Sequence, residues 1–445
     1  MAGFASKKSA LASALGLALM SAGAARALNV PAAKAAIDQK LDQQYPRLDA
    51  LYKDIHSHPE LGFQEARTAR VLAAQMRALG FEVTEGVGKT GLVAIYRNGP
   101  GPTVMVRTEL DALPLEEKTG LPYASHATQV WRGKETPVDH ACGHDIHMAV
   151  WVGVARTLTA LKGQWSGTLM FIAQPAEETV GGAQAMLNDG LFTRFKKPDY
   201  GFALHVGPGP FGQVAYRSGV VSSNSDDLEV TFTGKGGHGS MPNLTIDPVM
   251  MAGRFIVDVQ DVISREKDPS RFGVISIGSV QAGAAGNVIP DTALLRGTIR
   301  SFDPEVRSRM IDGIGRTARA EAAMAGAPEP KVEVSPGGKA VINDQGLTER
   351  SAAVLKTAFA GKAALLSDPN PASEDYSEFI IAGVPSFFFS LGGLDPDALA
   401  KAKAAHALVA ANHSPYFAPV PEPTIRTGVE AMSLVVMNVM PPAPA

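Results

Sequence analysis

The chain of 445 residues has one cysteine, Cys142, and almost equal numbers of acidic and basic residues. A single thiol excludes an intrachain disulfide. The formal net charge of −3 gives no basic surplus that would favour nucleic acid or an anionic membrane as a partner. Beyond the N-terminal segment, no apolar run is long enough to cross a bilayer as a helix. The sequence therefore predicts a globular protein that binds no nucleic acid.

The first 27 residues have the layout of a secretory signal peptide. Lys7 and Lys8 precede an apolar run over residues 11–20, and small residues follow up to Ala27. A basic region, a short apolar region and an Ala-x-Ala end are typical of a cleaved export signal. An alanine-rich terminal helix is the alternative. We expect a mature chain that begins near Leu28, has no membrane anchor, and is periplasmic or secreted.

Strand and helix patterns alternate through most of the chain, as in an α/β fold. Short, wholly apolar runs predict buried and mostly parallel strands, and longer amphipathic or apolar segments predict helices. From 222 to 336 the order changes to strand, helix, strand, strand, helix, strand, which is that of a ferredoxin-like unit. The predicted organisation is a signal peptide at 1–27, a catalytic domain formed by 28–221 and 337–445, and an inserted domain at 222–336.

Three apolar runs lead directly into chemically active side chains. Glu109 and Asp111 follow the first, Glu177 and Glu178 the second, and His205 the third. Ligands bind outside the carboxyl ends of the strands in sheets of this kind. Two adjacent carboxylates at a buried strand end repel each other and resist desolvation, and a bound cation removes that cost. A solvated helix start is the alternative for the glutamate pair alone.

The lone cysteine lies two residues before His144, in a segment with acids at both ends. Thiolate, imidazole and carboxylate are the ligands of zinc and similar divalent ions. Taken alone, the Cys-x-His pair also fits a buried apolar thiol or a reactive thiol. His205, the glutamate pair and the distant His413 favour a metal centre.

Nine segments carry a combined signal, and they are His58–Phe63, Leu110–Pro114, His140–Asp145, Gln174–Glu178, Leu204–Val206, Gly236–Pro242, Gly286–Pro290, Gly297–Arg300 and His413–Pro415. Together, and in this order, they resemble the aminoacylase and carboxypeptidase family of two-metal peptidases, and within it the amidohydrolase branch of hippurate hydrolases and indole-acetyl-amino acid hydrolases. The resemblance implies a two-metal exopeptidase-like α/β domain with a mixed, mostly parallel sheet, plus an inserted ferredoxin-like dimerisation (lid) domain.

The resemblance also implies two divalent ions per subunit, zinc or manganese first, with cobalt or nickel as alternatives. The implied metal ligands are Cys142, His144, Glu178, His205 and His413, with the thiolate of Cys142 bridging the two ions. Glu177 would act as general base and then as general acid. Asp111 would not bind metal itself but would orient one of the metal ligands.

By the same resemblance, the inserted domain would join two subunits, or more in a larger homo-oligomer. His238 would reach the partner's active site and stabilise the oxyanion, and Asn287 and Arg300 would bind substrate. The planar guanidinium of Arg300 suits a carboxylate. The expected substrates are therefore N-acyl amino acids, with an aromatic acyl group favoured. An exported dipeptidase or carboxypeptidase is the second candidate, and an inactive binding protein on the same scaffold is the third.

Two positions depart from the usual pattern of the branch. Glu109 stands where an aspartate is usual, and Asn243-Leu244 stand where Pro-His is more usual. Neither departure touches the five implied ligands. We expect His147 to be structural, and His56 and His58 to organise the turn at Pro59. The segment 373–376 matches the family near the site, and a substrate contact there is left open.

Overall fold

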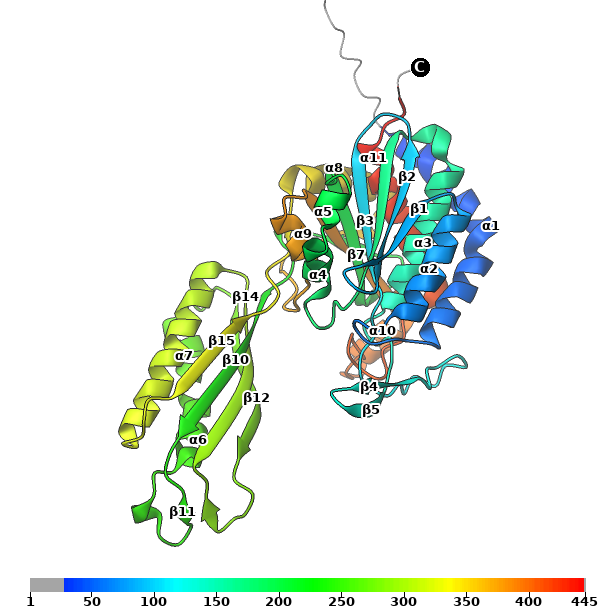
Figure 1. Cartoon of the computed structure of the whole chain (residues 1–445). Helices are drawn as coiled ribbons and strands as arrows, with labels where there is room; N and C mark the ends of the chain where they lie inside the picture. Colours follow the sequence, from blue (N-terminus) through cyan, green and yellow to red (C-terminus); the bar gives the residue numbers. More distant parts are fainter. Residues whose placement is uncertain (1–27, 444–445) are drawn as a thin grey trace, which may run out of the picture.

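The computed structural model describes residues 28–443, so the predicted signal peptide lies outside the described residues. Two bodies are visible in Figure 1, each built on its own sheet. The larger body holds both ends of the described chain. The smaller body is formed by a continuous central stretch of the sequence.

An eight-stranded sheet forms the centre of the larger body. Its order is β1 (Glu82–Val87), β2 (Gly91–Asn98), β6 (Gly167–Gln174), β3 (Thr103–Glu109), β7 (Tyr200–Pro210), β18 (Ser386–Leu394), β8 (Val214–Tyr216) and β17 (Ala363–Leu365). The four central strands β6, β3, β7 and β18 run parallel, while β1, β2 and β8 pair antiparallel with their inner neighbours. The predicted mixed, mostly parallel sheet is confirmed.

Helices cover both faces of this sheet (Figure 1). One face carries α1 (Val30–His56), α2 (Ala66–Ala78), α3 (His144–Ala160), α8 (Gln345–Ala358) and α11 (Pro421–Val439). The other carries α4 (Gly182–Asn188), α5 (Leu191–Arg194) and α9 (Ser377–Ile381). Alternate residues of β2 accordingly join different apolar clusters, Leu92 on the first face and Val93 on the second. Burial on both faces explains why the strands are apolar runs.

The smaller body is an antiparallel sheet in the order β12, β14, β10, β15. Along the chain its elements are β10 (Asn224–Thr233), α6 (Pro248–Asp258), β12 (Gly273–Ala282), β14 (Thr292–Ser301), α7 (Pro304–Met324) and β15 (Lys331–Pro336). This order and pairing are those of the ferredoxin-like unit expected from the sequence. Phe232, Phe255 and Met310 lie in an apolar core that is separate from those of the larger body.

Shorter elements complete the two bodies. They are β4 (Thr128–Trp131), β5 (Lys134–Pro137), η1 (Lys162–Gln164), β9 (Gly219–Val220), β11 (Gly237–His238), η2 (Pro242–Leu244), β13 (Val288–Ile289), β16 (Ile342–Asn343) and α10 (Pro396–Ala404). The small β11–β13 pair lies at the end of the smaller body that points away from the larger one (Figure 1). Among the residues described, no helix is both long and apolar enough to cross a membrane.

The apolar pattern of residues 247–266 predicts one helix, but α6 ends at Asp258 and a π-helical turn, η3 (Val262–Glu266), follows. This turn closes where the N–H of Lys267 donates to the carbonyl of Val262 (2.9 Å). The apolar run of residues 201–204 predicts a short strand, but β7 continues through His205 to Pro210 because β18 pairs with it along that length.

Candidate metal centre

The five implied metal ligands converge at one edge of the large sheet. Cys142 lies just before α3, His144 opens α3, Glu178 follows β6, His205 lies on β7, and His413 lies on the loop after α10. Their ligand atoms, with those of Glu177, form overlapping groups in which all atoms lie within 4.8 Å of one another. The Sγ of Cys142 is 3.4 Å from Nε2 of His205. The Nε2 of His413 is 3.4 Å from Oε2 of Glu178.

The backbone fixes the orientation of two imidazoles. The Nδ1 of His144 donates to the carbonyl of Asp111 (2.7 Å), and that of His205 donates to the carbonyl of Val206 (2.7 Å). A carbonyl can only accept, so each ring keeps a lone pair on Nε2. The Nε2 of His144 is buried and has no hydrogen-bond partner. Burial also lowers the pKa of His205 to about 3, which keeps it neutral. Neutral imidazoles held in this way are suited to metal binding.

The acidic groups of the centre are buried with little positive charge beside them. Burial, together with the charge of Glu374, raises the pKa of Glu177 well above its usual range. Burial raises the pKa of Glu178 to about 7, and its Oε1 has no hydrogen-bond partner. Burial and the neighbouring glutamates also raise the pKa of the Cys142 thiol. Divalent cations would stabilise the charged forms of all three groups, so the donor set fits a metal centre.

Exposure differs sharply among these ligands. The side chain of His144 is fully buried and that of Glu178 is 9% exposed, whereas that of His413 is 56% exposed. His413 also has a left-handed backbone, with φ of 67°, and its N–H donates to the carbonyl of Ala141 (2.9 Å). His413 therefore marks the open side of the centre.

Asp111 contacts two of the implied ligands, Glu178 and His144. Its Oδ2 accepts from the N–H of Glu178 (2.9 Å), and its backbone carbonyl accepts from His144. Its Oδ1 is buried without a hydrogen-bond partner, 3.7 Å from Nδ1 of His144. This is the place expected for a residue that orients ligands.

Glu109 and His147 form a second pair of residues that contacts the implied ligands without belonging to them. The Oε2 of Glu109 contacts Nδ1 of His147 (2.9 Å), and Nε2 of His147 accepts from the N–H of Val206 (2.8 Å). Both ring nitrogens of His147 are thus engaged, as expected for a structural residue. His147 still contacts the site, because its ring lies 4.6 Å from that of His205. The helical spacing of three residues from His144 is the sequence signal that places both rings on one face.

A buried ionic network extends behind Glu177. Arg107 pairs with Glu109, and it donates to Oε1 of Glu374 (2.7 Å) and to Oε1 of Gln174 (2.9 Å). Asp375 accepts from the side chain of Gln174 (2.5 Å) and from the N–H of Ala183 (3.0 Å). The carboxylates of segment 373–376 therefore face the protein interior, and the substrate contact left open for this segment receives no support from them.

His56 forms a further cluster that the sequence did not reveal. It is the last residue of α1, and its ring contacts Asp145 (Nδ1 to Oδ2, 2.6 Å) and Glu117 (Nε2 to Oε1, 3.2 Å). Burial opposes protonation, but these carboxylates raise the pKa of His56 to about 10. His56 therefore holds the start of α3, beside His144, whereas His58 is exposed and contacts only the end of α1.

The three residues expected to meet the substrate lie apart from this cluster within one chain. His238 is on β11 and is exposed, Asn287 precedes β13, and Arg300 is on β14. The N–H of Gly239 donates to the carbonyl of Asn287 (2.8 Å), which holds the first two segments together. The Nη1 of Arg300 is buried without a hydrogen-bond partner. All three belong to the smaller body (Figure 1).

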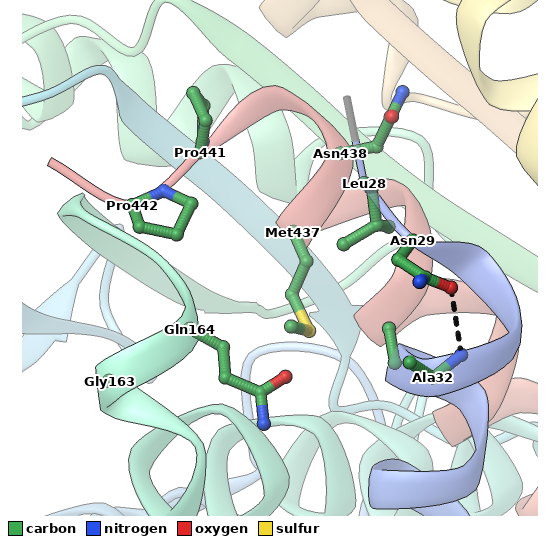
Figure 2. A pocket seen from close by; sticks show the side chains of 10 residues that line it. Leu28, Asn29, Ala32, Gly163, Gln164, Met437, Asn438, Pro441 and Pro442 are labelled. Carbon is green, nitrogen blue, oxygen red and sulfur yellow. Dashed lines mark hydrogen bonds between the residues drawn. The ribbon is translucent and has the colours of Figure 1, made fainter. Parts of the chain in front are cut away.

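A hollow of about 400 Å³ lies elsewhere, between the start of α1, η1 and the end of α11 (Figure 2). Its lining includes Leu28, Gln164, Met437 and Pro441. None of its ten lining residues is an acid, a histidine or a cysteine. It therefore offers no group for hydrolysis or metal binding, and the cluster around Cys142 is the better candidate for the reactive centre.

Comparison with known proteins gives consistent results. The model of peptidase family M20/M25/M40 matches residues 105–438. A hippurate hydrolase of Campylobacter jejuni is 36% identical over 346 residues, which is 77% of this chain and 87% of the relative. Thermostable carboxypeptidase 1 of Saccharolobus solfataricus is 35% identical over 342 residues, or 76% of this chain and 84% of the relative.

A solved structure from Bacillus subtilis is similar over almost the whole chain. It is described as a dinuclear metal-binding peptidase of the M20 family. The TM-score is 0.71 and the sequence identity 28%, with 90% of this chain and 100% of the other covered.

Proposed function

Because the chain belongs to peptidase family M20/M25/M40 and is a metal-dependent hydrolase of amide bonds, we propose that it cleaves N-acyl amino acids into a carboxylic acid and a free amino acid. The observation that carries this proposal is the convergence of the five implied ligands in overlapping groups, one of which includes Glu177 with His144 and Glu178. We further propose an aromatic acyl group, since one relative is named for hydrolysing hippurate, a benzoyl amino acid.

Members of this family bind two metal ions, and we assign their ligands to Cys142, His144, Glu178, His205 and His413, with Cys142 shared between the ions. Cys142 is suited to sharing because it belongs both to the group with His144 and His205 and to the group with Glu178 and His413. Bound divalent ions supply a Lewis acid and lower the pKa of water. Zinc or manganese is the proposed native metal, with cobalt or nickel as alternatives.

Glu177 is the proposed general base and acid. Its Oε2 lies 3.8 Å from the unpartnered Nε2 of His144, so it borders the ligands. A carboxylate at this position can take a proton from a water molecule and return it to the leaving amine. Glu177 and Glu178 thereby divide the work, one moving protons and the other binding metal.

We propose that the smaller body pairs with its counterpart in a second copy and carries His238 to the partner's centre. His238 lies at the far end of the smaller body, away from the metal ligands of its own chain. Apolar side chains near it are exposed, including Met241, Leu244, Met250 and Val288. Exposed apolar groups in one region favour association. Asn287 and Arg300 of the same body are proposed to hold the substrate, Arg300 through the free carboxylate.

Association of this kind can be tested by complementation. His238→Ala and Glu177→Gln variants are each expected to be inactive alone. In a mixed dimer, one of the two centres has both Glu177 and a partner's His238. About half of the dimers in an equal mixture are mixed, so unfolding and refolding the two variants together should restore about a quarter of the wild-type activity or less. Sedimentation should give a dimer. No recovery of activity in refolded mixtures that contain mixed dimers would contradict the exchange of His238 between subunits.

Export is also proposed, from the basic, apolar and small-residue regions of residues 1–27. Expression of the full chain in a Gram-negative host, followed by N-terminal sequencing of the periplasmic protein, should give a start near Leu28. A full-length protein confined to the cytosol would contradict this proposal.

An exported carboxypeptidase or dipeptidase is the second candidate, because a relative with 35% identity is named a carboxypeptidase. The deciding experiment loads the protein in turn with zinc, manganese, cobalt and nickel. Benzoyl, indole-acetyl and acetyl amino acids are then compared with dipeptides. We expect higher kcat/KM for the aromatic acyl series. Faster cleavage of dipeptides would favour the second candidate, and no cleavage with any metal would favour a binding protein.

A further inference from the structure

The carboxylate of Glu65 lies behind the turn that carries Glu177. Its Oε1 accepts from the backbone N–H of Ala176 (2.8 Å), and its Oε2 accepts from the hydroxyl of Thr90 (2.5 Å). The residue is fully buried at the start of α2. Both oxygens are engaged inside the protein, and the hydrogen bond from the N–H of Ala176 joins Glu65 to the turn at the centre.

Ala176 has a backbone conformation that needs such a support. Its φ is 48°, in the left-handed region that residues with a Cβ rarely adopt. Its carbonyl accepts from the N–H of Gly182 (3.2 Å), which closes the turn around Glu177. Unusual backbone conformations persist only where the surroundings hold them. The hydrogen bond from Ala176 to Glu65 is one such constraint.

The opposite side of the turn is held by Asp111, whose Oδ2 accepts from the N–H of Glu178 (2.9 Å). Two buried carboxylates therefore fix the backbone on either side of Glu177. Gly62 adds a steric limit, since a Cβ at this position would lie 3.1 Å from both Cα and Cβ of Ala176. The motif Gly62 to Glu65 thus touches the turn by packing and by hydrogen bonding.

We propose that Glu65 is a positioning residue that sets the direction of the Glu177 side chain by holding the N–H of Ala176. The proposal rests on the proposed function of Glu177 as general base. Misplacement by about 1 Å of a catalytic group can cost about 100-fold in rate. Since Glu65 has no contact with the ligand set, its loss should change kcat and leave metal binding in place.

The test compares Glu65→Ala with Glu65→Gln in the metal-loaded, full-length mature protein. The alanine variant lacks the acceptor, and we expect its kcat to fall about 100-fold with KM little changed and two ions per subunit retained. The amide oxygen of the glutamine variant can still accept from Ala176, and its NH₂ can donate to Thr90. This variant should recover most of the lost kcat.

Glu60→Ala is the matched control. Glu60 accepts from the N–H groups of Arg67 (3.1 Å) and Thr68 (2.7 Å) at the same end of α2, but it has no hydrogen bond to the turn at Glu177. Its loss should lower Tm and leave kcat unchanged. A merely structural role of Glu65 predicts the same for Glu65→Ala, and that result would overturn the proposal. Loss of the metal ions together with activity in Glu65→Ala would overturn it as well.

Gly62→Ala gives a second, independent measurement if Glu65→Ala fails to fold. The added methyl group displaces Ala176 without removing a polar group, and kcat should fall while the ions stay bound. Gly163→Ala is its control, because a Cβ at Gly163 meets nothing within 4 Å. Full kcat in Gly62→Ala would overturn the proposal. Turnover retained by Glu177→Gln would instead show that the proposed function of Glu177 is wrong.

Discussion

The ring of His56 contacts the carboxylate of Asp145 at 2.6 Å, one residue beyond the proposed metal ligand His144. This contact joins the last residue of α1 to the first turn of α3, two helices far apart in the sequence. The ligand segment around Cys142 is therefore anchored from a helix that contributes no ligand. Anchoring by a charged pair makes the stability of the larger body depend on pH.

The pH dependence follows from the raised pKa of His56, about 10 in the folded protein against about 6.5 in an unfolded chain. The pairing of protonated His56 with its carboxylates therefore stabilises the folded protein fully below pH 6.5, and this stabilisation is lost as the pH rises toward 10. His56→Gln should lower the free energy of unfolding by about 3 to 5 kcal/mol at pH 6. Urea unfolding at pH 6 and pH 10 measures this effect. The difference in the free energy of unfolding between wild type and His56→Gln should be smaller at pH 10. His58→Gln, an exposed control, should change little at either pH.

Glu177→Gln should keep both metal ions and lose turnover. An amide cannot take a proton from water, and the loss of a general base costs about 100- to 10,000-fold in kcat. Metal analysis beside steady-state kinetics measures both effects. Loss of ions in this variant would mean that the roles of Glu177 and Glu178 have been assigned in the wrong order.

Cys142→Asp tests the shared thiolate. Carboxylate oxygen is a harder donor than sulfur, so we expect a weaker affinity for zinc and lower activity. In the cobalt-loaded wild type, a thiolate ligand should give a sulfur-to-metal charge-transfer band, and this band should be absent from the variant. A variant that binds two ions and has full activity would show that neither metal binding nor catalysis needs the thiolate.

Glu109→Asp tests the departure from the usual aspartate. The shorter side chain cannot keep both the ion pair with Arg107 and the contact with His147, so one buried polar group loses a partner. The expected cost is about 1 to 3 kcal/mol in the free energy of unfolding, with the ions retained. Denaturant unfolding is the measurement. Glu82→Asp, in an exposed pair with Arg97, should cost less than about 1 kcal/mol. A more stable Glu109→Asp would show that the longer side chain is strained.

The sequence predicted the parts of the fold that depend on local pattern. The apolar runs at β2, β3 and β6 identify buried strands because both of their faces are covered. The sequence also predicts a long helix over residues 304–324, and α7 has these bounds, with Asp303 as its cap and apolar residues at helical spacing. The five implied ligands came from the family resemblance, and the structure brings them together at one edge of the sheet, Glu178 after β6 and His205 on β7.

Contacts between distant segments were beyond prediction from local pattern. The ion pair of Arg107 with Glu374 joins residues 267 positions apart, and although both segments were expected near the site, no local pattern pairs these two side chains. The proposed role of Glu65 depends on its hydrogen bond to the turn at Ala176, a contact that no local pattern around Glu65 indicates. His56 was expected to organise the turn at Pro59, and its contacts with Asp145 and Glu117 were missed because these residues come from segments far along the chain.

The proposed ligand set begins at Cys142 and is completed only by His413, on a loop that precedes the closing helix α11. No ribosome-bound fragment that ends before this loop can form the whole centre. The complete centre for both ions can therefore form only after synthesis of the chain has passed His413. If the protein crosses a membrane before it folds, the ions available in the receiving compartment, and not those of the cytosol, decide which metal the enzyme carries.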